Sequence, residues 1–329
     1  MSQKKGLIFC MAPLHVKIIV EFLACHGDEY KSITIVCRNN NLYKFFKELN
    51  YKYELVVLDK RIASKWQYLF PAKMRSFYVE DLKDLSIYQR YDDVIFTSIY
   101  IGTYGYYLKL LHGLGGKLIL LKSLSVKEVK RKLTFRQQID LLIKSKCFGI
   151  RFSPCFQGEN MVYRFPLEDY QATCMDVKGD IPSDKKINPL KNVDFKGKSA
   201  IVFANPYRDK FHPEDDYYNL FSKLIEYLHS EGYYVCLKGH PRIGVLECIR
   251  NKVDYIIPQY IPAEFLDYSA FSLAVGLTTT SLCDLSIPSY SLLGMVDVTD
   301  QDAYKYWIGY IKTNGHGSVR IVNSYNQIK

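Results

Sequence analysis

Short apolar runs alternate with amphipathic segments along the first part of the chain. The amphipathic segments carry apolar residues three and four positions apart, which is the spacing of one helix face. The apolar runs show no polar alternation, which is typical of strands covered on both faces of a parallel sheet. The expected strands are residues 5–10, 32–38, 54–58, 93–97 and 117–121, and the expected helices are residues 14–25, 42–49, 73–85 and 105–114.

The same alternation returns in the second part of the chain. The expected strands are residues 199–204, 233–237, 254–258, 271–275 and 289–296, and the expected helices are residues 214–232, 245–250, 261–268 and 302–311. Regular alternation of strands and helices predicts an α/β protein with two Rossmann-like domains. We expect an N-terminal domain at 1–175, a linker rich in Lys, Asp, Pro and Gly at 176–198, and a C-terminal domain at 199–329 whose final helix could cross back.

The stretch 122–167 differs from both halves because it is basic and, by its pattern, mostly helical. Its densest charge run is 126–132. We interpret such a run as a solvated helix face. Contact with anionic lipid headgroups or with a phosphorylated glycan acceptor is the alternative.

One loop carries candidate chemistry. The strand at 233–237 is followed by Lys238, Gly239, His240, Pro241 and Arg242. Ligands of open α/β sheets bind beyond the carboxyl ends of the strands, so His240 and Arg242 stand where a substrate would bind. His240 can exchange a proton near neutral pH, and Lys238 with Arg242 would attract a phosphate. The alternative is a histidine that merely ends a strand.

A second loop strengthens this interpretation. The strand at 271–275 is followed by Gly276, Leu277, Thr278, Thr279, Thr280 and Ser281. Hydroxyl groups and free backbone N–H groups at the start of a helix can hold a phosphate. Taken singly, this stretch is no more specific than an ordinary N-cap. Together, the two loops predict a site for a phosphate-bearing ligand.

These loops resemble the two donor-site motifs of bacterial GT-B sialyltransferases, in particular glycosyltransferase family 52, the lipooligosaccharide sialyltransferases. The opening run 7–16 resembles the first strand and turn of that family, and the run 93–98 resembles its later strand ending in Ser. The resemblance implies a GT-B-like fold, with two Rossmann-like domains whose parallel sheets face a central cleft. It also places Pro13, His15 and Ser98 on the acceptor side.

The resemblance implies an inverting, metal-independent transfer of sialic acid from CMP-sialic acid to a sugar hydroxyl of a bacterial surface glycan, such as lipopolysaccharide or capsule. His240 would assist the departure of CMP. The donor-binding residues would be Lys238, Gly239, Pro241, Arg242, Gly276, Thr278, Thr279, Thr280 and Ser281.

The general base is assigned through the same resemblance. Asp209 follows Pro206 in a setting one residue longer than the Pro-x-Asp of the family. Asp209 is therefore the candidate base. The alternatives are Glu214, Asp215 and Asp216, although acidic residues also gather in the first turn of a helix to complement its dipole.

One departure from the family keeps other functions open. Related sialyltransferases carry a D/E-D/E-G motif after the last strand of the first domain, and the corresponding stretch here is Leu121-Lys122-Ser123-Leu124-Ser125. Asp209 then serves as base unaided, or the acceptor differs, or the donor is not CMP-sialic acid. A transferase that uses another nucleotide sugar and a non-catalytic nucleotide-binding module are the competing functions.

The charge balance limits the classes of binding partner that we expect. Lys and Arg exceed Asp and Glu by 44 to 34, which favours polyanionic partners, but the basic residues are scattered and no nucleic-acid-binding motif occurs.

Nine Cys without a C-x-x-C pair indicate reduced thiols in a cytoplasm. No apolar run approaches the roughly 18 residues of a membrane span. We expect a cytoplasmic protein that could contact the inner membrane peripherally and use a lipid-linked acceptor.

No metal or other cofactor is expected. The tripeptide Asp300-Gln301-Asp302 matches the D-x-D pattern of metal-dependent transferases, but its place near the C-terminus favours a polar loop. The oligomeric state is left open by the sequence.

Overall fold

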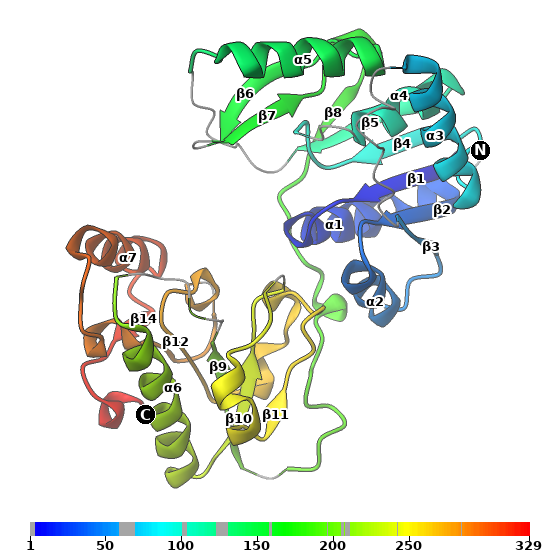
Figure 1. Ribbon diagram of the computed structural model, residues 1–329. Coiled ribbons are helices and arrows are strands. Elements are labelled where there is room, and N and C mark those ends of the chain that lie inside the picture. Colours follow the sequence, from blue (N-terminus) through cyan, green and yellow to red (C-terminus); the bar gives the residue numbers. More distant parts are fainter. Residues whose placement is uncertain are drawn as a thin grey trace. The chain divides into compact units, whose positions relative to one another are not determined.

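The computed structural model describes residues 4–58, 70–100, 104–122, 131–157, 160–195, 197–204, 207, 211–241, 243–283 and 285–329. The chain forms two compact units, Met1–Pro182 and Ser183–Lys329, which are called the first and the second domain below (Figure 1). Candidate residues Asp209 and Arg242, and the stretch 123–130 with most of the basic run, lie outside the described residues.

The first domain is built on a parallel sheet of six strands with the order β3-β2-β1-β4-β5-β8. The strands are β1 (Lys4–Cys10), β2 (Tyr30–Cys37), β3 (Glu54–Val57), β4 (Asp93–Phe96), β5 (Lys117–Lys122) and β8 (Thr173–Asp176). The connecting helices are α1 (Val16–His26), α2 (Asn40–Glu48), α3 (Pro71–Asp84) and α4 (Gly105–Gly113). β1 and β4 are buried along almost their whole length, as their continuous apolar sequences predict.

The stretch after β5 is only partly helical. Helix α5 (Phe135–Phe148) is followed by an antiparallel hairpin of β6 (Ser153–Gln157) and β7 (Asn160–Arg164). The prediction of a mostly helical stretch is therefore wrong for its second half. Phe152 and Cys155 are buried in this half of the stretch. Their packing against the core, rather than the helical pattern of the sequence, therefore decides the strand conformation.

The second domain repeats the topology of the first, with the strand order β11-β10-β9-β12-β13-β14. The strands are β9 (Lys198–Phe203), β10 (Tyr233–Lys238), β11 (Tyr255–Ile256), β12 (Leu273–Gly276), β13 (Ser289–Ser291) and β14 (Val319–Ile321), and the helices are α6 (Glu214–Ser230) and α7 (Gln301–Asn314). All neighbouring strands are parallel. Both sheets have the strand order of a Rossmann fold, which confirms the predicted GT-B-like fold class.

Short 3₁₀ turns replace two predicted α-helices of the second domain. They span Glu247–Lys252, Ala263–Phe265 and Tyr268–Ala270. Pro262 lacks an N–H group and is the N-cap of the middle turn, and the Asp267 side chain accepts a hydrogen bond from Ser269 N, which starts a new turn. Helical spacing is present in the sequence, but these residues limit each turn.

The end of the chain belongs to the second domain. Ile311 of α7 is buried in the second core, with Trp307 and Ile308 packed against it. β14 then adds a sixth strand, and the hydroxyl group of Tyr290 donates a hydrogen bond to the Lys329 carbonyl at 2.5 Å. α7 is thus part of the second domain, where the sequence left open a return to the first.

Candidate functional site

The predicted donor residues that the structure describes lie at the carboxyl ends of β10 and β12, the two strands that flank β9 in the second sheet. Strand order reverses between β9 and β12, and open α/β sheets bind ligands at the carboxyl ends of the strands around such a reversal. Phe203, the last residue of β9, pairs with Lys238 of β10 on one side and with Gly276 of β12 on the other. The two loops therefore start two strand spacings apart, a distance of only about 10 Å.

The loop of residues 239–244, here named the His240 loop, is closed by its own backbone. His240 N donates to Gly244 O at 2.8 Å, and Gly244 N donates to His240 O at 2.9 Å. Gln259 Nε2 donates to Pro241 O at 3.0 Å and ties the loop to the segment after β11. A Cβ atom on Gly239 would lie 2.3 Å from Gly244 O, so this close approach requires glycine. His240 itself is half-buried at the carboxyl end of β10.

Lys238 lies under the loop rather than on its surface. Its side chain is 2% exposed, and its Nζ donates to Gly239 O at 2.8 Å. Burial lowers the pKa of Lys238 to about 8, and the charge of Glu264 opposes this shift. The sequence predicts that Lys238 attracts a phosphate; in the structure its ammonium group instead contacts the loop backbone, which it positions.

The lowered pKa of Lys238 predicts a pH-dependent stability. Because the folded pKa is below the ordinary value of 10.5, the unfolded chain binds the proton more tightly, and the free energy of unfolding rises as pH increases from about 8 to 10.5. We expect Lys238→Met to stabilise the protein by about 1–2 kcal/mol near neutral pH, and this advantage to shrink above about pH 8.

Urea unfolding of the wild type and Lys238→Met across this pH range measures the difference. Lys223→Met is the matched control, because Lys223 is exposed on α6 and its replacement should change stability little at any pH. A variant that is less stable than the wild type by the same amount at every pH would contradict the expectation.

The loop of residues 276–283, here named the threonine loop, turns back over the end of β12. Thr279 Oγ1 accepts a hydrogen bond from Ser281 N at 3.3 Å and caps a 3₁₀ turn, Thr280–Leu282. The predicted helix start is therefore a single turn, and its side chains rather than a helix dipole would contact a ligand. Thr280 is exposed, and Thr278, Thr279 and Ser281 are partly exposed. A Cβ atom on Gly276 would lie 2.8 Å from Thr279 Cγ2, so the loop packs closely on this glycine.

The first domain has its own strand reversal, between β1 and β4, and the predicted acceptor-side residues lie there. Pro13 and His15 form the turn that follows β1. His15 is 8% exposed, and burial lowers its pKa to about 4, so the ring is neutral at physiological pH. Ser98 follows β4, but its Oγ accepts a hydrogen bond from Tyr100 N at 3.1 Å and so stabilises its own turn.

Three further residues that follow β2 and β4 or start α4 were not found from the sequence: Thr97, Tyr104 and Arg38. His15 Nδ1, Thr97 Oγ1 and Tyr104 Oη are buried polar atoms without a hydrogen-bond partner. The Arg38 guanidinium, at the end of β2, lies 5.9 Å from the centre of the Tyr104 ring and donates to Met11 O at 3.4 Å. Buried polar atoms normally have hydrogen-bond partners, so these three atoms are candidate positions for contact with a polar ligand or water.

A sequence signal existed for some of these residues. Thr97 adjoins Ser98 directly after a buried strand, and Arg38 follows β2 in the same way. Tyr104 comes from the start of α4, and nothing in the local sequence links it to the strand ends.

Among the acidic candidates, the described ones lie in ordinary structural positions. Glu214, Asp215 and Asp216 form the first turn of α6, where they complement the helix dipole. Asp300 of the D-x-D tripeptide caps α7, and its Oδ1 accepts hydrogen bonds from Asp302 N and Ala303 N at 3.0 and 3.1 Å. This explains the tripeptide without a metal ion.

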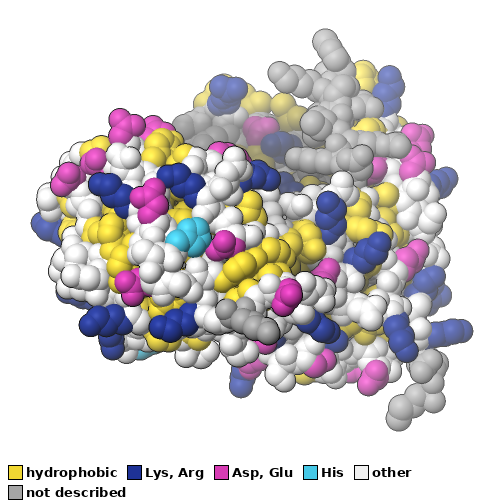
Figure 2. All heavy atoms as spheres, turned by 90° about the horizontal axis from the view of Figure 1, so that it is seen from below, with side chains coloured by type: hydrophobic (Ala, Val, Ile, Leu, Met, Phe, Trp, Pro, Cys, Tyr) yellow, Lys and Arg dark blue, Asp and Glu magenta, His cyan; other side chains and the backbone are white. Residues whose placement is uncertain are grey.

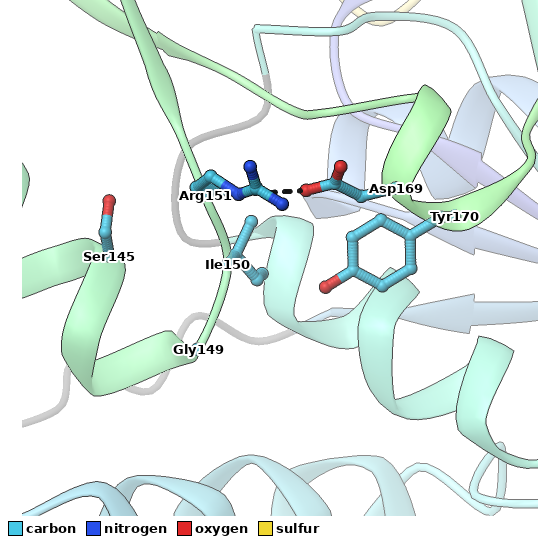
Figure 3. Close-up of a pocket in the computed structure, with 6 residues that line it drawn as sticks. All are labelled: Ser145, Gly149, Ile150, Arg151, Asp169 and Tyr170. Carbon is cyan, nitrogen blue, oxygen red and sulfur yellow. Dashed lines mark ion pairs between the residues drawn. The ribbon is translucent and has the colours of Figure 1, made fainter.

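A pocket of about 560 Å³ opens in the first domain at the end of α5 (Figure 3). Its lining residues are Ser145, Gly149, Ile150, Arg151, Asp169 and Tyr170. Arg151 and Asp169 point toward each other, with Nε and Oδ2 3.7 Å apart (Figure 3). The pocket contains none of the predicted site residues.

Neither a metal-binding cluster nor a membrane-spanning helix occurs among the described residues. No group of three or more His, Cys, Asp or Glu side chains in the described part of the chain is arranged to hold a metal ion. No described helix has the length and apolar character needed to cross a membrane.

Comparison with known families identifies the reaction class. The family model "Alpha-2,8-polysialyltransferase (POLYST)" matches residues 159–293, a segment that includes both the His240 loop and the threonine loop. The matched segment, less than half of the chain, is similar to this family. The chain is a glycosyltransferase, as the sequence predicts. Among curated proteins, no sequence matches the chain.

Solved structures with a similar fold have low sequence identity to this chain. A UDP-GlcNAc 2-epimerase from Methanocaldococcus jannaschii has 11% identity and a TM-score of 0.47, over 98% of this chain and 90% of its own. A glycosyl transferase of family 9 from Veillonella parvula has 14% identity and a TM-score of 0.45, over 89% and 82%. A sialyltransferase from Photobacterium damsela has 11% identity and a TM-score of 0.39, over 97% and 81%. No activity is inferred from these similarities.

Proposed function

We propose that this glycosyltransferase transfers sialic acid from CMP-sialic acid to a sugar hydroxyl of a bacterial surface glycan, with inversion and without a required metal. The observation that carries the proposal is the pairing of Phe203 with both Lys238 and Gly276. It brings the His240 loop and the threonine loop to one strand reversal, within the segment that matches a polysialyltransferase family model.

The donor side of the reaction is assigned to the second domain. CMP leaves from the anomeric carbon with growing negative charge on its phosphate. His240 supplies a hydrogen bond or a proton to that phosphate, a contribution worth roughly 10²–10⁴-fold in rate. Hydroxyl and backbone N–H groups of the threonine loop bind the phosphate oxygens. Arg242, adjacent in sequence to the His240 loop residues described, completes the proposed donor contacts.

The acceptor side is assigned to the first domain. The neutral His15 ring and the hydroxyl groups of Thr97 and Tyr104 offer hydrogen bonds to the hydroxyl groups of a sugar. Arg38 adds a positive charge beside them. Asp209 is the proposed base that removes the proton of the attacking hydroxyl group.

Nucleotide binding tests the donor assignment. We expect CMP to raise the Tm of the protein, while UDP, GDP and ADP do so much less, because the proposed site holds one phosphate beside a cytidine. Addition of Mg²⁺ should not change the shift. A larger shift with a nucleoside diphosphate would favour a different nucleotide-sugar donor, which the missing D/E-D/E-G motif at 121–125 already makes the second candidate.

A non-catalytic nucleic-acid-binding function finds little support. On the face shown in Figure 2, Lys and Arg side chains are spread among acidic and neutral ones rather than gathered in one tract. Binding to a polyanion through many phosphates would weaken steeply with salt, whereas one nucleotide in a pocket would respond little. The same thermal-shift measurement at two salt concentrations separates the two cases.

A further inference from the structure

The outer face of α5 carries a dense group of exposed apolar side chains. The large apolar residues that are exposed in the described part of the chain are Leu14, Phe70, Phe135, Ile139, Leu142, Ile143 and Tyr306. Four of these belong to α5, and Phe135 and Leu142 are 77% and 70% exposed. At 3.6 residues per turn, the four fall within a stripe about 100° wide. This stripe is here named the α5 face.

The opposite side of α5 anchors the helix in the first domain. Phe148 is buried in the first core, and Leu141 packs against it. Lys144 Nζ donates to the hydroxyl group of Tyr163 on β7 at 2.9 Å. The helix starts with a capping box, in which Thr134 and Gln137 exchange hydrogen bonds between side chain and backbone. α5 lies beside the β6–β7 hairpin (Figure 1) and is held to it through Lys144. The four side chains of its apolar stripe remain exposed.

Basic residues surround the α5 face. Arg131 and Lys132 precede the helix, Arg136 flanks the stripe, and Lys146 ends it, and all four are exposed. The one acidic residue of α5, Asp140, is paired with Lys144 at 3.0 Å. The surroundings of the stripe are therefore positively charged.

We propose that the α5 face docks the first domain on an anionic lipid surface, with the helix lying in the plane of the membrane interface. A helix of 14 residues is too short to span a bilayer, which takes about 20. An apolar stripe bordered by Lys and Arg is the pattern of helices that lie at such an interface. A second copy of this chain would meet the same positive charges and would be repelled. The proposal does not rest on the sialyl-transfer function.

Vesicle cosedimentation tests the docking. The probes are vesicles of phosphatidylcholine with about 30% phosphatidylglycerol, and vesicles of phosphatidylcholine only. We expect the wild-type chain to bind the anionic vesicles and the double variant Phe135→Ser/Leu142→Ser to bind at least about tenfold more weakly. Arg136→Glu should weaken binding severalfold, and more so at low salt.

Tyr306→Ser is the matched control, because Tyr306 is 63% exposed on α7 of the second domain and should be irrelevant to docking. Equal binding of the wild type and the double variant would overturn the proposal, as would equal binding to both kinds of vesicle. A dimeric wild type that the double variant converts to a monomer, with no vesicle binding, would show that a second copy covers the α5 face instead.

Discussion

Replacement of His240 by Ala is expected to lower kcat by roughly 10²–10⁴-fold while the affinity for CMP changes little. The loss is expected in kcat because, in the proposed mechanism, the imidazole acts on charge that develops as CMP leaves, whereas the threonine loop would hold the phosphate already in the ground state. Steady-state kinetics with CMP-sialic acid and a glycan acceptor, together with titration of CMP, separate the two quantities. Added imidazole should restore part of the activity of His240→Ala.

His229→Ala is the control for this experiment. His229 lies near the end of α6, is partly exposed, and has its Nε2 2.9 Å from Asp254 Oδ2, outside both loops. Its removal breaks a surface pair worth little and should leave kcat unchanged. Equal losses of kcat and of CMP affinity in His240→Ala would contradict a role of His240 in the departure of CMP and would make it a binding residue.

The second large effect is expected from Gly239→Ala. The added methyl group would lie 2.3 Å from Gly244 O and 2.7 Å from Val245 Cγ1, so the backbone bridge between His240 and Gly244 must open or shift. Forcing such a shift costs about 1–3 kcal/mol of stability. A displacement of His240 by about 1 Å would lower turnover by up to roughly 10²-fold.

Gly309→Ala is the matched control for the same substitution. Gly309 lies within α7, and a Cβ atom added to it would have no neighbour within 4 Å, so alanine should stabilise the helix by about 0.5–1 kcal/mol. Gly239→Ala should therefore lower both the Tm and kcat. Gly309→Ala should raise the Tm and leave kcat unchanged. A Gly239→Ala enzyme with the stability and activity of the wild type would show that the His240 loop tolerates rearrangement.

The sequence by itself determined most of the α/β order. Apolar runs such as the one that forms β1 are local patterns, and buried parallel strands need no partner information to be recognised. The two loops were also found locally, since a glycine ends each strand abruptly shortly before His240 and Thr278. Because parallel strands end at one edge of a sheet, a candidate site at that edge followed from the sequence, and the family resemblance suggested its chemistry.

Only the tertiary structure decided the positions that depend on packing. Lys238 is a charged residue of a type that is rarely buried, yet in the folded domain it is 2% exposed and its Nζ contacts the carbonyl group of Gly239. Thr97 rather than Ser98 carries the unpartnered hydroxyl group, because the hydroxyl group of Ser98 is used within its own turn. β14 has only three residues and becomes a strand by pairing with β13. Local periodicity fixes which segments form elements, whereas burial and hydrogen-bond partners come from residues that are distant in the chain and meet only in the folded domain.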